Sequence, residues 1–230
     1  MRQAPGIAAA LVFFSCAAIA TSHSQTSAPP VFHSAEVVSA TGVKIPFNSV
    51  AVGMVELRVT ISKTGAVKDI QVIRELASVT DQSIQSVKSW VFKPAIFNGT
   101  PIASQMTVSV VFCPYTGSKS ISLSPIESES KSDAPDAGLP ATPVEITVAQ
   151  FPRDFNARTT SGTVVLQVSI GQDGQQGLVR VVKDIPPLTG ATQEAIKDWK
   201  FAAASIGNRK ITSNIVLAFA YRTPPIYVPN

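Results

Sequence analysis

The sequence predicts an α+β protein built from two tandem β-β-α-β units, each a three-stranded, mainly antiparallel sheet with one helix packed on one face. Three observations predict it. Residues 53–112 align without a gap onto residues 162–221 at a constant offset of 109, with 14 of 60 positions identical. Each copy opens with alternating apolar residues, the period of a half-buried strand. Each copy also contains apolar residues at helical spacing. A repeat of this length indicates one supersecondary unit present twice.

The first strand and the turn after it are predicted from this alternation. In the first copy the buried positions are apolar: Val55, Leu57, Val59 and Ile61. The polar positions between them, such as Glu56, are expected to face water. Gly65, matched by Gly174, then supplies a hairpin turn. A second strand is expected over about residues 67–74, or 178–183 in the second copy.

A helix follows the second strand in each unit. In the first copy Thr80 or Asp81 is expected to cap it. Its apolar stripe contains Ile84, Val87 and Trp90. This stripe is expected to pack across one face of the sheet.

The last strand of each unit is expected over about residues 102–112 and 211–221. The two tryptophans of the chain, Trp90 and Trp199, take the same place in the two copies, just ahead of these strands. Because they share the apolar stripe, we expect them in the core and not on an aromatic binding platform.

Outside the two units, the amino-acid composition indicates linker segments. The segment after the first unit is rich in Ser, Pro, Asp and Gly, which is typical of a flexible linker. The resulting organisation is a signal peptide (1–20), a tether (21–35), a first domain (36–114), a linker (115–143), a second domain (144–224) and a tail (225–230).

The N-terminus resembles a secretory signal peptide. Arg2 is followed by a mostly apolar run over residues 6–20, which ends in a small-x-small pattern. The run is shorter than the ~20 residues that span a bilayer. We therefore expect export to the periplasm. Two alternatives remain open: residues 6–20 are retained as an inner-membrane anchor, or Cys16 is a lipid attachment site. Membrane contact is expected only through this segment.

The residue inventory argues against catalysis. The two histidines, His23 and His33, fall in the predicted tether, so neither unit can hold a histidine-based triad or a histidine-rich metal site. The net charge of +4 has no clustered basic run, which excludes a nucleic-acid surface. Glu75 and Asp184 occupy the one acidic position kept in both copies, and a solvated ion pair with the preceding basic residue is expected there. The sequence predicts no catalytic residue, cofactor or metal; a periplasmic enzyme using these carboxylates or a lysine is a third alternative.

Cysteine usage leaves one thiol after signal cleavage. Cys113 lies at the end of an apolar strand pattern. A small buried hydrophobe is the expected role, and an intermolecular disulfide is the alternative.

Two motifs of the first unit resemble the TonB C-terminal domain family. They are Trp-x-Phe-x-Pro-Ala at residues 90–95 and Asn-Gly-Thr-Pro-Ile at residues 98–102. The second unit lacks the proline within residues 201–204 and reverses the Asn-Gly order at residues 207–208. The resemblance implies a periplasmic domain of transmembrane transport, whose last strand pairs with a short segment of an outer-membrane receptor. Function is expected in the first copy before the second.

An open three-stranded sheet has two edges to which extended peptides can add. We therefore expect a non-enzymatic periplasmic adaptor that pairs a protein or peptide partner with the last strands. The alternative is a membrane-anchored, TonB-like energy transducer. The expected partner-binding residues lie in and just before the last strands: Ile102, Ser104, Met106, Val108, Val110, Ile211, Ser213, Ile215 and Leu217.

Overall fold

The computed structural model describes residues 31–46, 49, 51–113, 120–122, 138–147, 149 and 161–222. The predicted signal peptide, the tether up to residue 30, most of the linker and the tail lie outside the described residues. We call the described part of residues 31–113 the first module and that of residues 120–222 the second module.

The first module consists of one helix and eight strands. In chain order they are β1 (Phe32–His33), β2 (Glu36–Ser39), β3 (Gly53–Ile61), β4 (Val67–Arg74), α1 (Thr80–Lys88), β5 (Val91–Lys93), β6 (Ala95–Phe97), β7 (Thr100–Ile102) and β8 (Ser104–Phe112).

The second module repeats this order with small changes. Its elements are β9 (Ser120–Ser122), β10 (Thr142–Thr147), β11 (Gly162–Ile170), β12 (Gln176–Lys183), α2 (Leu188–Ala195), a 3-10 turn (Ile196–Asp198), β13 (Lys200–Ala202), β14 (Ala204–Ile206), β15 (Arg209–Ile211) and β16 (Ser213–Tyr221).

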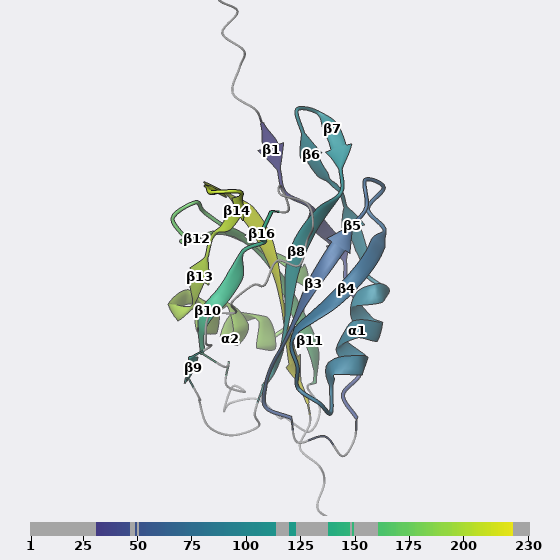
Figure 1. The fold of residues 1–230 in the computed structure, drawn as a ribbon. Helices are drawn as coiled ribbons and strands as arrows, with labels where there is room; N and C mark the ends of the chain where they lie inside the picture. The colour runs from purple at the N-terminus through teal and green to yellow at the C-terminus, as the bar shows by residue number, and fades with distance from the viewer. Residues whose placement is uncertain are drawn as a thin grey trace, which may run out of the picture.

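One six-stranded sheet joins the two modules (Figure 1), in the order β12-β11-β16-β8-β3-β4. All neighbours are antiparallel except β16 and β8, which run parallel from Val216↔Val108 to Ala220↔Phe112. The mixed α+β class is confirmed. The two separate three-stranded sheets expected from the repeat are instead fused through their last strands.

The two helices cover opposite faces of this sheet (Figure 1). Side chains alternate between faces along a strand. In β8, Val110 therefore joins the core beneath α1, and Val111 joins the core beneath α2. Each core also takes residues from the other module: Ala218 packs in the α1 core and Met54 in the α2 core. The modules thus share their cores.

The N-terminal segment of each module is folded. Both modules therefore begin earlier in the chain than the predicted domains. Residues 31–46, the first lead segment, contain β1 and β2, so the predicted tether is structured from residue 31 and His33 lies in a strand. Residues 138–149, the second lead segment where described, contain β10, so the predicted linker ends before 143. Only residues 31–35 and 138–143 were assigned to the tether and the linker; residues 36–46 and the rest of the second lead segment fell inside the predicted domains.

The lead segments are themselves repeats, at a different offset. Ala35 and Ala141 are both buried. Trp90 Nε1 donates to the Thr41 carbonyl at 3.1 Å, and Trp199 Nε1 donates to the Thr147 carbonyl at 2.9 Å. Ala35 and Ala141, like Thr41 and Thr147, are 106 residues apart, three fewer than the offset of 109 in the rest of the repeat.

The tryptophan positions are confirmed as core, although they lie outside the helices. Trp90 is 4% exposed and Trp199 5%. Helix α1 ends at Lys88, two residues before Trp90. The N-cap is Val79, while the Thr80 hydroxyl accepts from the Leu76 N–H at 3.0 Å.

Candidate peptide-binding cleft

The structure places the predicted edge strands at the centre of the sheet. Strand β8 pairs with β3 on one side and β16 on the other, and β16 pairs with β11 and β8. These strands are therefore not edges. An unpaired strand edge tends to bind another strand. Because β8 and β16 belong to one chain, each is present at a high effective concentration near the other, which favours their pairing.

The predicted site residues divide into two groups. Five lie within the buried strands: Met106, Val108, Val110, Ile215 and Leu217. The other four lie where the strands begin: Ile102 and Ile211 end the preceding strands β7 and β15, and Ser104 and Ser213 open β8 and β16. The structure brings this second group together.

These four residues lie around one opening, because the parallel ladder between β8 and β16 does not extend to the first residues of these strands. It begins at Val108↔Val216, so residues 104–107 and 213–215 lie outside it. We call this opening the fork cleft. Phe32 of β1 and Ile102 at the end of β7 line it, and Figure 1 shows these two strands at one end of the sheet. The fork cleft has a volume of about 330 Å³, at the lower end of ligand pockets, roughly 300–1,000 Å³.

Backbone direction identifies one open bonding position in the fork cleft. The Cys113 N–H donates to the Ala220 carbonyl of β16 at 3.1 Å. Along a strand, the backbone N–H and C=O of successive residues point to alternate sides. Gln105 lies eight residues before Cys113, an even number, so its N–H and C=O also point toward β16. Gln105 lines the cleft and lies outside the ladder.

The equivalent position of the second module is already filled. Asn214 corresponds to Gln105, and its N–H donates to the Ser34 hydroxyl at 3.1 Å. Its side-chain amide also donates to the Ala35 carbonyl at 3.0 Å. At the lead-segment offset, Ser34 corresponds to Pro140, which lines the cleft and has no hydroxyl. Within the part of the chain that the structure describes, the β16 side of the fork cleft is therefore bonded at Asn214, whereas no described residue fills the β8 side at Gln105.

Two equivalent serines beside the fork cleft have buried hydroxyls that lie on opposite faces of the sheet. The Ser104 and Ser213 Oγ atoms are buried and have no hydrogen-bond partner among the described residues. Both residues line the cleft. Leaving a buried hydroxyl unpaired costs about 1–3 kcal/mol.

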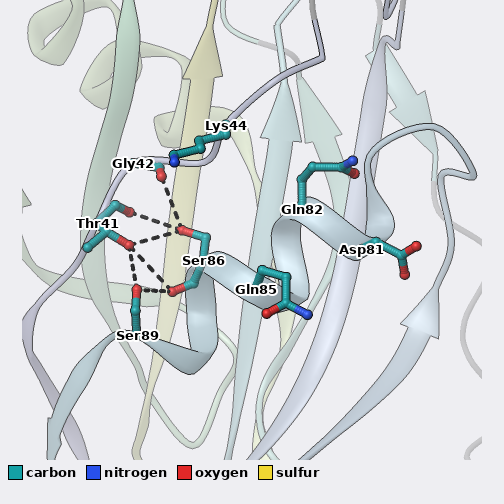
Figure 2. A pocket seen from close by; sticks show the side chains of 8 residues that line it. All are labelled: Thr41, Gly42, Lys44, Asp81, Gln82, Gln85, Ser86 and Ser89. Carbon is teal, nitrogen blue, oxygen red and sulfur yellow. Dashed lines mark hydrogen bonds between the residues drawn. The ribbon is translucent and has the colours of Figure 1, made fainter.

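A second cavity, of about 510 Å³, lies between α1 and the first lead segment. Figure 2 shows that the side chains of Thr41, Ser86 and Ser89 turn toward one another there. Thr41 Oγ1 lies 2.7 Å from Ser89 Oγ, and Ser86 Oγ donates to the Gly42 carbonyl at 3.3 Å. Because these hydroxyls bond within the protein, this groove offers less unmet capacity than the fork cleft.

The sheet face opposite α1 buries a carboxyl group that sequence reasoning placed in water. Glu56 is 1% exposed, because the continuous sheet brings that face of β3 into the protein. The Arg74 Nε lies 3.8 Å from Glu56 Oε2, so Arg74 contacts Glu56. Burial raises the pKa of Glu56 from 4.5 to about 7, against the attraction of Arg74 and Arg58.

The raised pKa of Glu56 predicts a pH-dependent stability. Because the folded pKa exceeds the unfolded value, the unfolded chain binds fewer protons between pH 4.5 and about 7. The free energy of unfolding should therefore fall as pH rises through this window and level off above it. Glu56→Gln should remove this slope and be more stable above pH 7 by about 1–3 kcal/mol. Urea unfolding across the pH range measures this; the exposed Glu75→Gln is the control, and a slope that persists in Glu56→Gln would contradict the assignment.

Two smaller predictions can be compared with the structure. Cys113 is 6% exposed with a free thiol, as expected of a small buried hydrophobe. Burial raises the pKa of its thiol, against a hydrogen bond from Tyr221. Asp184 is exposed and accepts a hydrogen bond from the Thr189 hydroxyl.

Sequence reasoning missed the residues that shape the fork cleft. Gln105 lies one position from the predicted Ser104, and no periodic signal distinguishes it. The Ser34-to-Pro140 difference becomes visible only at the offset of 106, which the alignment at 109 does not contain.

The sheet is assembled from two copies of one unit, and the parallel ladder at its centre stops before the strands begin. The family model for the Gram-negative bacterial TonB protein C-terminal matches residues 51–114 and 147–223. The chain therefore belongs to the TonB C-terminal family, in tandem, and the predicted resemblance is confirmed. No curated protein and no solved structure matches it.

The family supplies the coarse functional assignment. Its members are non-enzymatic, periplasmic, transport-related domains that interact with proteins such as outer-membrane receptors. None of the helices within the described ranges is long and apolar enough to cross a membrane.

Proposed function

We propose that this protein is a non-enzymatic periplasmic adaptor that captures an extended peptide segment by strand pairing in the fork cleft. The observation that carries the proposal is the backbone of Gln105, which faces the cleft outside the ladder between β8 and β16. An extended segment, such as one from an outer-membrane receptor, would continue the interrupted ladder at this point. Backbone hydrogen bonds of this kind supply affinity in β-augmentation.

The fork cleft is favoured over the rest of the last strands because it is already open. Val108, Val110, Val216 and Ala218 are fully buried along the seam between β8 and β16. Exposing even one such valine costs roughly 1.5–3 kcal/mol. Separating the modules to free the whole strand would therefore cost more than strand pairing returns.

The outer edges β4 and β12 support docking less well. Both strands carry register irregularities against their inner neighbours, at each end of the paired stretch. Such bulges twist an edge away from a potential partner strand.

A backbone substitution at Gln105 tests strand pairing. Gln105→Pro removes the N–H that faces the cleft. It leaves the ladder with β3 intact, because the residues on either side of Gln105 make the hydrogen bonds to β3. Gln105→Ala keeps the N–H and is the matched control. The probe is a decapeptide selected against the full chain from a displayed random library, with affinity measured by titration calorimetry.

We expect Gln105→Pro to weaken peptide binding about tenfold, equivalent to one hydrogen bond of about 1.4 kcal/mol. Gln105→Ala should stay within about twofold. Far-ultraviolet circular dichroism and thermal unfolding would verify that the proline variant is folded. A folded proline variant with unchanged affinity, or a library that yields no binder, would refute the proposal.

A further inference from the structure

The first lead segment occupies the start of β16. The Ser34 hydroxyl accepts a hydrogen bond from the Asn214 N–H at 3.1 Å, and the Ala35 carbonyl accepts one from the Asn214 side-chain amide at 3.0 Å. The parallel ladder with β8 has not yet begun at this point, since it starts at Val216. The chain itself therefore supplies a partner for the part of β16 that the ladder leaves out.

The second lead segment follows the same path beside β8. Leu139 forms an antiparallel bridge with β14, as His33 does with β6 in the first module. The residue that follows Leu139 is Pro140, which lines the fork cleft together with Gln105. The two lead segments are therefore placed equivalently, and Pro140 occupies in one the position that Ser34 occupies in the other.

The two strands offer the same donors, but the lead segments bring different groups to them. Gln105 and Asn214 each combine a backbone N–H with a side-chain carboxamide. The side chain of Pro140 has no atom that accepts a hydrogen bond, so it cannot do for Gln105 what the Ser34 hydroxyl does for Asn214. The exposures agree with this difference, because Gln105 is exposed and Asn214 is half-buried.

We infer that the chain contains two equivalent sites for an extended peptide segment, and that one lead-segment residue beside each site decides whether it is available. Ser34 occupies the site at Asn214 from within, whereas Pro140 leaves the site at Gln105 open. The site on β16 is therefore autoinhibited, and removal of the Ser34 hydroxyl makes it available to the same class of segment. The identity of the occupant rests on the proposed function; the occupancy of the two N–H groups does not.

Amide hydrogen exchange, measured by NMR on the full chain, tests the occupancy without any peptide. Pro140→Ser should slow the exchange of the Gln105 N–H at least about tenfold relative to Pro140→Ala, because only serine brings a hydroxyl. Ser34→Ala should speed the exchange of the Asn214 N–H at least about tenfold relative to Ser34→Thr, which keeps the hydroxyl. Each pair is an independent test, and equal rates within either pair would overturn the inference.

Peptide binding then shows whether the released position captures a segment. In the Gln105→Pro background, adding Ser34→Ala should raise the affinity for the library-selected decapeptide at least about threefold, and adding Ser34→Thr should not. In the otherwise unchanged chain, Pro140→Ser should bind about tenfold more weakly than Pro140→Ala. No gain from Ser34→Ala would overturn the second site and leave capture by β8 intact. Unchanged affinity of Gln105→Pro alone would instead refute the proposed function, and the exchange rates would still decide the occupancy.

Discussion

Replacing Gly65 by alanine is expected to destabilise the protein by about 3 kcal/mol or more. Gly65 has a φ of +85°, and a Cβ there would lie well inside contact distance of the Phe92 carbonyl oxygen. The left-handed conformation costs a non-glycine residue roughly 1–2 kcal/mol. Displacing the backbone of β5 adds a cost of overpacking of about 1–3 kcal/mol. Urea unfolding of the full chain measures the loss.

Gly99 provides the matched control for this prediction. Its φ of +79° is nearly the same, yet a Cβ there would meet nothing within 4 Å. Gly99→Ala should therefore show the conformational cost alone, about 1–2 kcal/mol. Equal losses in the two variants would mean that the contact between the hairpin turn and β5 does not constrain the fold.

Replacing Ala218 by aspartate is expected to destabilise both modules, by about 4 kcal/mol or more. Ala218 is fully buried, pairs with Val110 across the parallel seam, and packs in the core beneath α1 of the other module. A carboxylate there would lack both water and a counter-charge. Because the core is shared, the damage should reach the first module although the substitution lies in the second.

The fluorescence of Trp90 can report on the first module in a Trp199→Phe background. Ala218→Asp should lower the midpoint of this signal together with that of the circular dichroism. Val181→Asp, on the outer strand β12 with the side chain 37% exposed, is the control and should change the free energy of unfolding by about 0.5 kcal/mol or less. A Trp90 transition unaffected by Ala218→Asp would show that the modules fold independently.

The long strands and hairpin turns of each module could be predicted, because each is encoded by a pattern of residues that are neighbours in the sequence. The alternation from Val55 to Ile61 corresponds to β3, and the strand expected over residues 67–74 is β4. Gly65 and Gly174 adopt the positive φ that the predicted hairpin turns require. The motif around Trp90 identified the family, which the family model confirms.

The candidate site could be predicted only in part. The last strands were singled out, and Ser104 and Ser213 do line the fork cleft. Val108, Val110 and Leu217 lie instead in the buried seam, since the edge they were expected to form is occupied by the other module. Glu56 was assigned to solvent for the same reason: its face is exposed in an isolated module and buried in the joined sheet.

The sequence by itself determined the repeat, its three long strands, helix and hairpin turn, its core tryptophans and its family. These depend on periodicity and on the conformational limits of single residues, which are encoded locally. The tertiary structure alone decided that the two last strands pair in parallel, that residues 31–35 and 138–143 belong to the folded modules, and where the ladder between β8 and β16 stops. A strand's pattern shows which of its faces is apolar but does not identify the neighbour at its edge, because all backbones offer the same hydrogen-bonding groups. The open position at Gln105 exists only because that neighbour is β16 and the residue beside it is Pro140.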